Sequence, residues 1–288
     1  MQVGIGLPAT IPGVSGALIV EWARRADVGP FSSLSLIDRL VYPNYEPLMV
    51  LAAAASTTRR IRLMTSVLVA PLRDTAVLAK QALSLDAISD GRFTLGVGIG
   101  NRGGDYLAAG VSFTDRGRRL ERQVKELKRI WAGDAVSAEF GAIGPSAVRP
   151  GGPELLIGGH SPIPLRRAGR LGDGFLSSAG TPASVRADYD IVEAAWKAEG
   201  RLGRPRFVLG MYFALGPDAA TRGGDSVRHY YAFRGAEAAE RIVNSVPTSA
   251  EAIREKLRGY ESVGLDEVLL WPCIPELDQV DRLADLVR

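Results

Sequence analysis

The feature that most constrains this chain is a regular alternation of short apolar segments with longer stretches of helical pattern. Near-continuous apolar runs, as in Phe93–Ile99 and Glu267–Trp271, are typical of parallel strands covered on both faces. Eight such segments alternate with helices, which predicts the α/β class and a closed (β/α)8 barrel. The expected strands are Val3–Leu7, Leu34–Ile37, Ile61–Val69, Phe93–Ile99, Glu154–Gly158, Gly174–Ser178, Phe207–Phe213 and Glu267–Trp271.

The chain is expected to be one domain, residues 1–288, because no Pro/Gly/Ser linker divides it. A doubly wound open sheet is the structural alternative. Three connections are longer than turns: 100–115 after the fourth strand, 133–153 before the fifth and 216–235 after the seventh. Barrel active sites lie on the loops that follow the strands, so the first and third connections are functional candidates.

Local signals fix some helices more sharply. An apolar stripe at three- and four-residue spacing predicts a helix over Arg116–Trp131. Thr181 followed by Pro182 reads as an N-cap with proline at the first helical position. The segment from Thr248 to Glu251 reads as a capping box.

Composition excludes several classes of protein. Net charge is +3 with acidic and basic residues interspersed, which argues against nucleic-acid binding. A single cysteine, Cys273, forms no disulfide framework, and two histidines offer no zinc-ligand spacing. No apolar run reaches the roughly 18 residues of a membrane helix, and the start lacks the pattern of a signal peptide. A cytoplasmic protein that does not act on membranes is therefore expected.

Several segments, in order, resemble the bacterial luciferase-like monooxygenase superfamily. VGIGLP resembles its first strand, and LSLIDRL its second strand with the acidic end. The block AKQALSLDAISDGRFTLGVG is the most specific piece, and IGGHSPIPLRRAGRLGDGF resembles the fifth and sixth strands. The ending TSAEAIREKLRGYESVGLDEVLLWP is similar to the last helix and strand. The resemblance covers most of the chain except residues 133–153 and 214–246.

The resemblance implies a reduced cofactor, coenzyme F420 or FMN, over the carboxyl ends of the strands. It also implies a non-prolyl cis peptide bond at Ser66–Val67, against the cofactor ring. Without the resemblance, a trans bond in an ordinary strand is expected there.

Three polar positions are candidates for chemistry. Asp38 follows the second strand, where similar deazaflavin enzymes place an aspartate beside the ring; a helix cap or a partner for Arg39 is the alternative role. Arg39 stands where several relatives have histidine, which replaces an acid/base group with a fixed cation. His229, in the connection after the seventh strand, is a candidate proton donor or pocket residue, although exposure alone would also explain it.

Backbone and side-chain groups at other strand ends are candidates for cofactor binding. Glycines allow close approach to a planar ring, and N–H groups at a helix start favour phosphate. Asn101 occupies the position of a catalytic glutamate in the sugar-phosphate dehydrogenase branch, which argues against that reaction. The candidate cofactor-binding residues are Asp38, Ser66, Val67, Gly98, Gly100, Asn101, Gly158, Gly159, His160, Arg166, Ser178, Gly180 and Thr181.

Three functions follow, in order of preference. The first is an F420-dependent oxidoreductase that passes a hydride between deazaflavin C5 and a small organic substrate. The second is an FMNH₂-dependent monooxygenase supplied by a separate flavin reductase. The third is a non-catalytic flavin-binding relative. A homodimer is expected because relatives are often dimeric.

Overall fold

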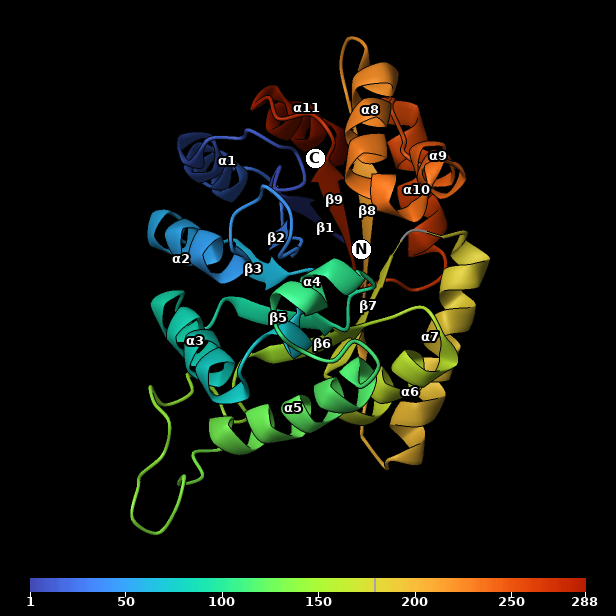
Figure 1. Cartoon of the computed structure of the whole chain (residues 1–288). Helices are drawn as coiled ribbons and strands as arrows, with labels where there is room; N and C mark the ends of the chain where they lie inside the picture. The colour runs from blue at the N-terminus through green and yellow to red at the C-terminus, as the bar shows by residue number, and fades with distance from the viewer. Residues whose placement is uncertain (179) are drawn as a thin grey trace.

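The computed structural model describes residues 1–178 and 180–288, and its strands form a closed parallel barrel (Figure 1). Strand β1 pairs with β2 and β9, and β3 pairs with both β2 and β5, so no edge is left open. This closure excludes the open sheet and confirms the (β/α)8 prediction. The strands are β1 Gln2–Gly6, β2 Ser33–Leu36, β3 Arg62–Thr65, β4 Leu68–Val69, β5 Phe93–Gly98, β6 Glu154–Gly158, β7 Gly174–Ser178, β8 Arg206–Phe213 and β9 Glu267–Pro272.

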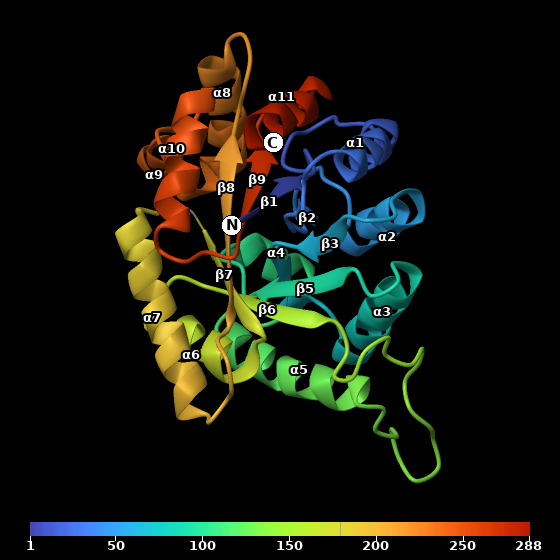
Figure 2. The same cartoon turned by 180° about the vertical axis from the view of Figure 1, so that it is seen from behind.

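Helices surround the barrel and bury their apolar faces against it (Figures 1 and 2). None of the described helices is both long enough and apolar enough to cross a membrane. The α-helices are α1 Gly16–Val28, α2 Pro47–Thr57, α3 Thr75–Ile88, α4 Gly103–Ala108, α5 Arg116–Trp131, α6 Pro162–Leu171, α7 Pro182–Ala198, α8 Ala219–Tyr231, α9 Ala236–Val243, α10 Ala250–Glu261 and α11 Asp278–Val287. Two short 3₁₀ turns are η1 Ala70–Leu72 and η2 Ala232–Arg234.

The expected strands are present, with one interruption. The segment predicted as a single strand over Ile61–Val69 is divided into β3 and β4. The peptide bond Ser66–Val67 between them is cis, as the resemblance implied. Strand β4 then pairs with the end of β5, which keeps this part of the chain in the barrel wall.

Two local predictions had different outcomes. Helix α5 spans the predicted residues, because its apolar stripe is buried on the side that contacts α3, α6 and η1. The capping-box prediction was wrong by one residue: Ser249, not Thr248, caps α10, and its hydroxyl accepts from the Ala252 N–H at 3.2 Å.

The three long connections differ in character. Residues 100–115 contain the short helix α4, which lies in front of the strands in Figure 1 and behind them in Figure 2. Residues 133–153 are irregular and extend away from the barrel in both views. Residues 216–235, expected to be a loop, are largely the helix α8 and the turn η2. Helix α8 forms because Ala219, Val227 and Tyr230 fall on one face and are buried.

The amino end of the barrel is closed by charged side chains. Buried Glu267 accepts hydrogen bonds from Ser32 and Ser33 and forms an ion pair with Arg206. Arg206 also pairs with Glu154, which links β8 to β6. These contacts satisfy the buried carboxylate of Glu267 and fix the starts of four strands.

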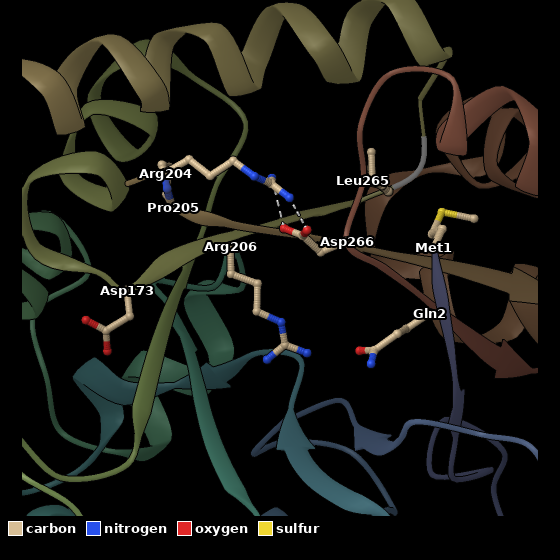
Figure 3. Close-up of a pocket in the computed structure, with 8 residues that line it drawn as sticks. All are labelled: Met1, Gln2, Asp173, Arg204, Pro205, Arg206, Leu265 and Asp266. Carbon is tan, nitrogen blue, oxygen red and sulfur yellow. Dashed lines mark hydrogen bonds and ion pairs between the residues drawn. The ribbon is translucent and has the colours of Figure 1, made fainter. Parts of the chain in front are cut away.

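Outside this layer lies a hollow of about 710 Å³ (Figure 3). Arg204 and Asp266 pair across one side, and Arg206 and Gln2 point toward the middle. A smaller hollow of about 330 Å³ includes Arg149 and Glu154, also at the starts of strands. Because catalytic loops of such barrels lie at the opposite end, neither hollow is assigned to the chemistry.

Candidate active site

The predicted site residues lie at the carboxyl ends of five strands. Asp38 follows β2, Ser66 and Val67 separate β3 from β4, and Gly100 follows β5. The residues after β6 and β7 complete the set, with Ser178 at the end of β7. Closure of the barrel therefore brings groups that are distant in sequence together at the carboxyl end of the strands, which we call the mouth.

Val67 is fitted closely into the barrel wall. A Cβ atom added at Gly98 would lie 2.6 Å from Val67 Cγ2, and one at Gly158 would lie 3.0 Å from Val67 Cγ1. Gly100, at φ +60°, similarly makes room for Val69. Because these glycines have no side chain, they leave room for Val67 and Val69. The Val67 side chain remains partly exposed at the mouth.

Behind Val67, hydrogen bonds hold Ser66 in place. Trp271 Nε1 donates to Ser35 Oγ at 3.0 Å and to Ser66 Oγ at 3.2 Å. The Trp271 indole fills the barrel centre, where a Cβ at Gly210 would lie 1.9 Å from its ring. A packed interior therefore supports the segment at Ser66.

Asp38 is paired with Arg73 rather than with Arg39. Arg73 donates to Asp38 Oδ2 at 2.7 Å and to Oδ1 at 3.3 Å, and the Val69 N–H donates to Oδ2 at 2.8 Å. The Asp38 side chain is only 2% exposed. Burial lowers the pKa of Arg73, but the charges and hydrogen bonds of Asp38 and Glu46 together outweigh it, so that the pKa is raised. The hydrogen bonds of the Asp38 carboxylate to Val69 and Arg73 therefore hold this part of the chain in place.

Arg39 points into a cluster of aromatic rings. Its Cζ lies 4.0 Å from the ring centre of Tyr42 and 4.4 Å from that of Tyr230. Its Nη1 donates to the Tyr230 carbonyl at 2.8 Å. Stacking of this kind with a fixed guanidinium joins the loop after β2 to helix α8.

Helix α4 is attached to the same loop. Asp105, 3% exposed, accepts from the Val41 N–H at 2.8 Å. Arg102 lies 3.7 Å from Asp105 and 4.5 Å from the ring centre of Phe233 in η2. Asn101 is exposed beside them, so the structure places it at the mouth without a fixed contact that would identify its role.

The end of β7 meets the start of α6. His160 Nε2 and Ser178 Oγ lie 3.3 Å apart. Although much of His160 is accessible, desolvation of its ring by the surrounding protein lowers its pKa, more than the charge of Asp188 raises it. At neutral pH this imidazole is uncharged and can exchange a hydrogen bond with the serine.

The start of α6 offers fewer backbone donors than expected. Pro162 and Pro164 have no N–H, and Leu165 donates to the Ser161 carbonyl at 3.1 Å. In the first three helical positions only Ile163 carries an N–H. An anion at this corner would therefore rely more on side chains than the glycine-rich sequence suggested.

Arg166 is the cation best placed to contribute. It is exposed on α6 and has no acidic partner among residues 1–178 and 180–288, whereas Arg167 and Arg170 both face Glu121. Gly159 is required locally, because an added Cβ would lie 2.3 Å from Pro164 Cβ.

Two predicted contacts have structural roles in the same corner. Thr181 caps α7, with its hydroxyl accepting from the Ser184 N–H at 3.2 Å, as predicted from Thr181 and Pro182. The Gly180 carbonyl accepts from Tyr260 Oη at 2.8 Å. Both residues remain exposed and close to Ser178 in the chain.

His229 and Cys273 do not lie in comparable settings. His229 is exposed on the last turn of α8, with its ring centre 6.1 Å from that of Tyr42. Cys273 is 3% exposed, and burial raises its pKa well above the usual range. The thiol stays protonated and behaves as a small buried hydrophobe.

Sequence reasoning missed several residues at the mouth. Arg73 was not singled out, because its partner Asp38 is distant in sequence and meets it only when the barrel closes. Arg102 was not singled out either: its acidic partner Asp105 is three residues away, but its contact with Phe233 depends on the fold. Tyr212 and Tyr231 were also not assigned; their hydroxyls lie 3.2 Å apart, and burial raises the pKa of both phenols. The double tyrosine in the segment RHYYAF was the only available signal.

The mouth fits a flat, anionic cofactor. Glycine seats hold Val67 where a ring could pack, and Arg166 and exposed Arg234 lack acidic partners within the described chain. Ser178 and His160 add hydrogen-bonding groups at one side. An anion with an apolar ring would satisfy these cations and cover Val67.

Comparisons with known proteins agree with this architecture. A family model described as luciferase-like monooxygenase matches residues 1–264. An uncharacterized protein of Mycobacterium tuberculosis is 31% identical, with 57% of this chain and 66% of the relative covered. The F420-dependent glucose-6-phosphate dehydrogenase of Nocardia farcinica is 31% identical, with 54% of this chain and 48% of the relative covered. The chain thus spans from about half to just under two thirds of these relatives.

Solved structures share the fold over nearly the whole chain. An F420-dependent secondary alcohol dehydrogenase, in complex with an F420–acetone adduct, superposes with a TM-score of 0.82 at 17% identity, covering 100% of this chain and 98% of that one. A monooxygenase from Streptomyces bottropensis gives 0.79 at 22% identity, covering 99% and 97%. At such identities the likeness establishes the fold alone.

Proposed function

This chain belongs to the luciferase-like monooxygenase family, and we propose that it is an F420-dependent oxidoreductase acting on a small organic substrate. The observation that carries the proposal is the position of Val67 at the mouth, where Gly98 and Gly158 leave the space that its side chain occupies. Relatives that use F420 at about 30% identity support the choice of deazaflavin.

Different groups of residues would bind the ring of the cofactor and its anionic side chain. Val67 would buttress the ring, supported from behind by Ser66 and Trp271. Ser178, His160 and Arg166 would hold the anionic side chain of the cofactor. When bound, the deazaflavin supplies hydride transfer at its C5.

The protein's own groups orient the reactants and exclude water. Asp38 holds Arg73 and the Val69 N–H, which fixes the chain next to Val67. Helix α4 lies in front of the strands in Figure 1, and Arg102 next to it stacks on Phe233. Arg39 stays a cation and so does not serve as a general acid. Burial raises the pKa of Tyr231, so this phenol stays protonated, and its Oη lies 3.2 Å from that of Tyr212.

A two-component FMN monooxygenase is the second candidate, supported by the structural likeness to the Streptomyces bottropensis monooxygenase. The same mouth would then receive reduced FMN from a separate reductase. A non-catalytic flavin-binding role is the third, because Arg39 and Asn101 supply no acid/base group.

Fluorescence titration separates these candidates. The purified protein is titrated with oxidised F420 and FMN in parallel, and with the reduced forms under anaerobic conditions. The proposal predicts micromolar binding of F420, about −8 kcal/mol, with little affinity for FMN. Preference for reduced FMN, together with oxygen consumption, would replace it with the monooxygenase. Binding of neither would remove the cofactor proposal and leave the fold intact.

A further inference from the structure

Two arginines from different loops meet at one aromatic ring over the mouth. The Cζ atoms of Arg39, after β2, and Arg102, after β5, lie 5.2 and 4.5 Å from the ring centre of Phe233. Arg39 is fixed by Tyr42 and Tyr230, as described above. The loops themselves are joined by the bond between Val41 N–H and Asp105.

Both guanidinium groups have unused donors. Arg39 Nε and Arg102 Nη1 are buried and have no hydrogen-bond partner among the described residues. Arg62 and Arg167, whose Nε atoms are also buried and unpartnered, each face a carboxylate. Arg116 is the exception: its Nε has no partner among the described residues, and it stacks alone on Phe113. A buried donor left unsatisfied costs about 1–3 kcal/mol, so two at one place point to an acceptor supplied from outside the chain.

The neighbouring acids do not supply that acceptor. In the described chain no carboxylate lies within 4.0 Å of an Arg39 nitrogen. Asp105 reaches Arg102 only at 3.7 Å, and it already accepts from Val41. The charge of the pair is therefore incompletely balanced by the protein.

The ring beside these donors lies on an exposed element. Phe233 is 41% exposed and belongs to η2, a turn without buried residues. A ligand that bound both guanidinium groups would have to displace this ring, whereas the stacking of Arg39 on Tyr42 and Tyr230 could remain.

We propose that Arg39 and Arg102 together bind a carboxylate of the substrate, which makes the substrate class a small aromatic or unsaturated organic acid. This rests on the proposed function and specifies its substrate. A carboxylate suits the site because guanidinium groups bind it through two parallel N–H···O bonds. The exposed ring of Phe233 and the partly exposed ring of Tyr42 favour a flat, unsaturated body beside it.

The test measures binding of benzoate, benzamide and inorganic phosphate by isothermal titration calorimetry in low-salt buffer. Benzoate and benzamide have nearly the same shape and differ in charge. We expect benzoate to bind at least about tenfold more tightly than benzamide, as charge-assisted bonds imply. Equal binding of the two, or tighter binding of phosphate than of benzoate, would overturn the proposal. This comparison needs no variant.

Substitutions then locate the effect. Arg39→Met and Arg102→Met should each weaken benzoate binding about tenfold or more, while Arg39→Lys should restore part of it and Arg254→Met, on exposed α10, should leave it unchanged. Affinity for F420 should remain within about threefold in all of them, a difference worth under 1 kcal/mol. Loss of F420 affinity equal to the loss of benzoate affinity would assign the pair to the acidic groups of the cofactor instead.

The outcome is independent of the cofactor proposal. Benzoate binding that depends on Arg39 and Arg102, in a protein that binds no F420, would contradict the proposed function and keep the anion site. F420 binding without any preference for benzoate would do the reverse.

Discussion

At the scale of single residues, the mouth is built by side chains whose roles depend on partners far along the chain. Asp38 was predicted to lie beside the cofactor ring, with a helix cap or a pair with Arg39 as the alternative role. Its carboxylate is bound by Arg73 and the Val69 N–H, which indicates a positioning role. That partnership could not be predicted, because 35 residues separate Asp38 from Arg73 and only barrel closure brings them together.

Replacing Asp38 with asparagine tests this role. Asp38→Asn is expected to cost about 3 kcal/mol, because it removes one member of a largely buried ion pair. Urea unfolding measures the loss, and F420 affinity and turnover should fall together. Glu46→Gln, which removes the exposed partner of Arg73, should cost less than about 1 kcal/mol. Unchanged stability with a collapse of turnover alone would instead make Asp38 a proton relay.

The seat of Val67 makes a second prediction. Gly98→Ala places a methyl group 2.6 Å from Val67 Cγ2, and is expected to destabilise the protein by about 1–3 kcal/mol through overpacking. The double variant Gly98→Ala/Val67→Ala should recover much of this loss, as a double-mutant cycle would record.

Gly96 provides the matched control. A Cβ there would lie 2.0 Å from the Thr65 carbonyl oxygen, so its obstacle is backbone. Gly96→Ala should therefore be damaging whether or not Val67 is shortened. Additive effects at Gly98 and Val67 would mean that their contact does not shape the mouth.

At the scale of elements, the hydrophobic pattern within a segment predicted those strands and helices that bury one of their own faces. Apolar runs gave strands β1, β2 and β5–β9 to within one residue, and helix α5 completely, because each buries its own face. The division of β3 from β4 was not predicted, since periodicity reads one strand; the resemblance implied only the cis bond at Ser66–Val67, where the division falls. Helix α8 was missed because Gly223 and Gly224 lower helix propensity, yet an added Cβ at Gly223 would lie 2.9 Å from Ala214 Cβ.

Arg149 attaches the irregular connection over residues 133–153 to the barrel. Its guanidinium donates to the Phe93 carbonyl at 3.1 Å and lies 3.6 Å from Asp86, which is fully buried on α3. Burial raises the pKa of Asp86. The charge of Arg149 lowers this pKa in part, and the Phe93 N–H lowers it less. Neither carboxylate oxygen of Asp86 has a hydrogen-bond partner of ordinary geometry among the described residues.

This arrangement predicts a pH-dependent effect of Arg149→Met. A folded pKa above the unfolded value means that the stability contribution of Asp86 is fully present below its unfolded pKa and is lost as pH rises through the folded pKa. Removing Arg149 raises the folded pKa further, so destabilisation should be greater at pH 7 than at pH 4. Loss of the Phe93 bond adds a part independent of pH, about 1 kcal/mol.

Urea unfolding at both pH values measures the difference. Arg122→Met, which breaks an exposed pair with Asp115, is the control and should show a small effect at either pH. An equal loss for Arg149→Met at pH 7 and pH 4 would show that Asp86 is not ionised against Arg149.

At the scale of the whole molecule, the two ends of the barrel have different tasks. The amino end is closed by paired charges around Glu267 and Arg206, with the larger hollow outside it (Figure 3). The carboxyl end has glycines that leave room for Val67 and Val69, and arginines whose charge is not fully balanced by carboxylates of the described chain. Eight alternating segments were enough to predict this polarity, because every strand of a parallel barrel points the same way. Which cations remain unpaired depended on the loops and could not be predicted.

The central claim is that a deazaflavin binds at the carboxyl end, against Val67. The most direct test is a crystal structure of the chain grown with F420. We expect the ring in contact with Val67 and its anionic side chain near Ser178, His160 and Arg166. A ring bound in the hollow lined by Arg204 and Arg206, or at any site away from Val67, would contradict the account.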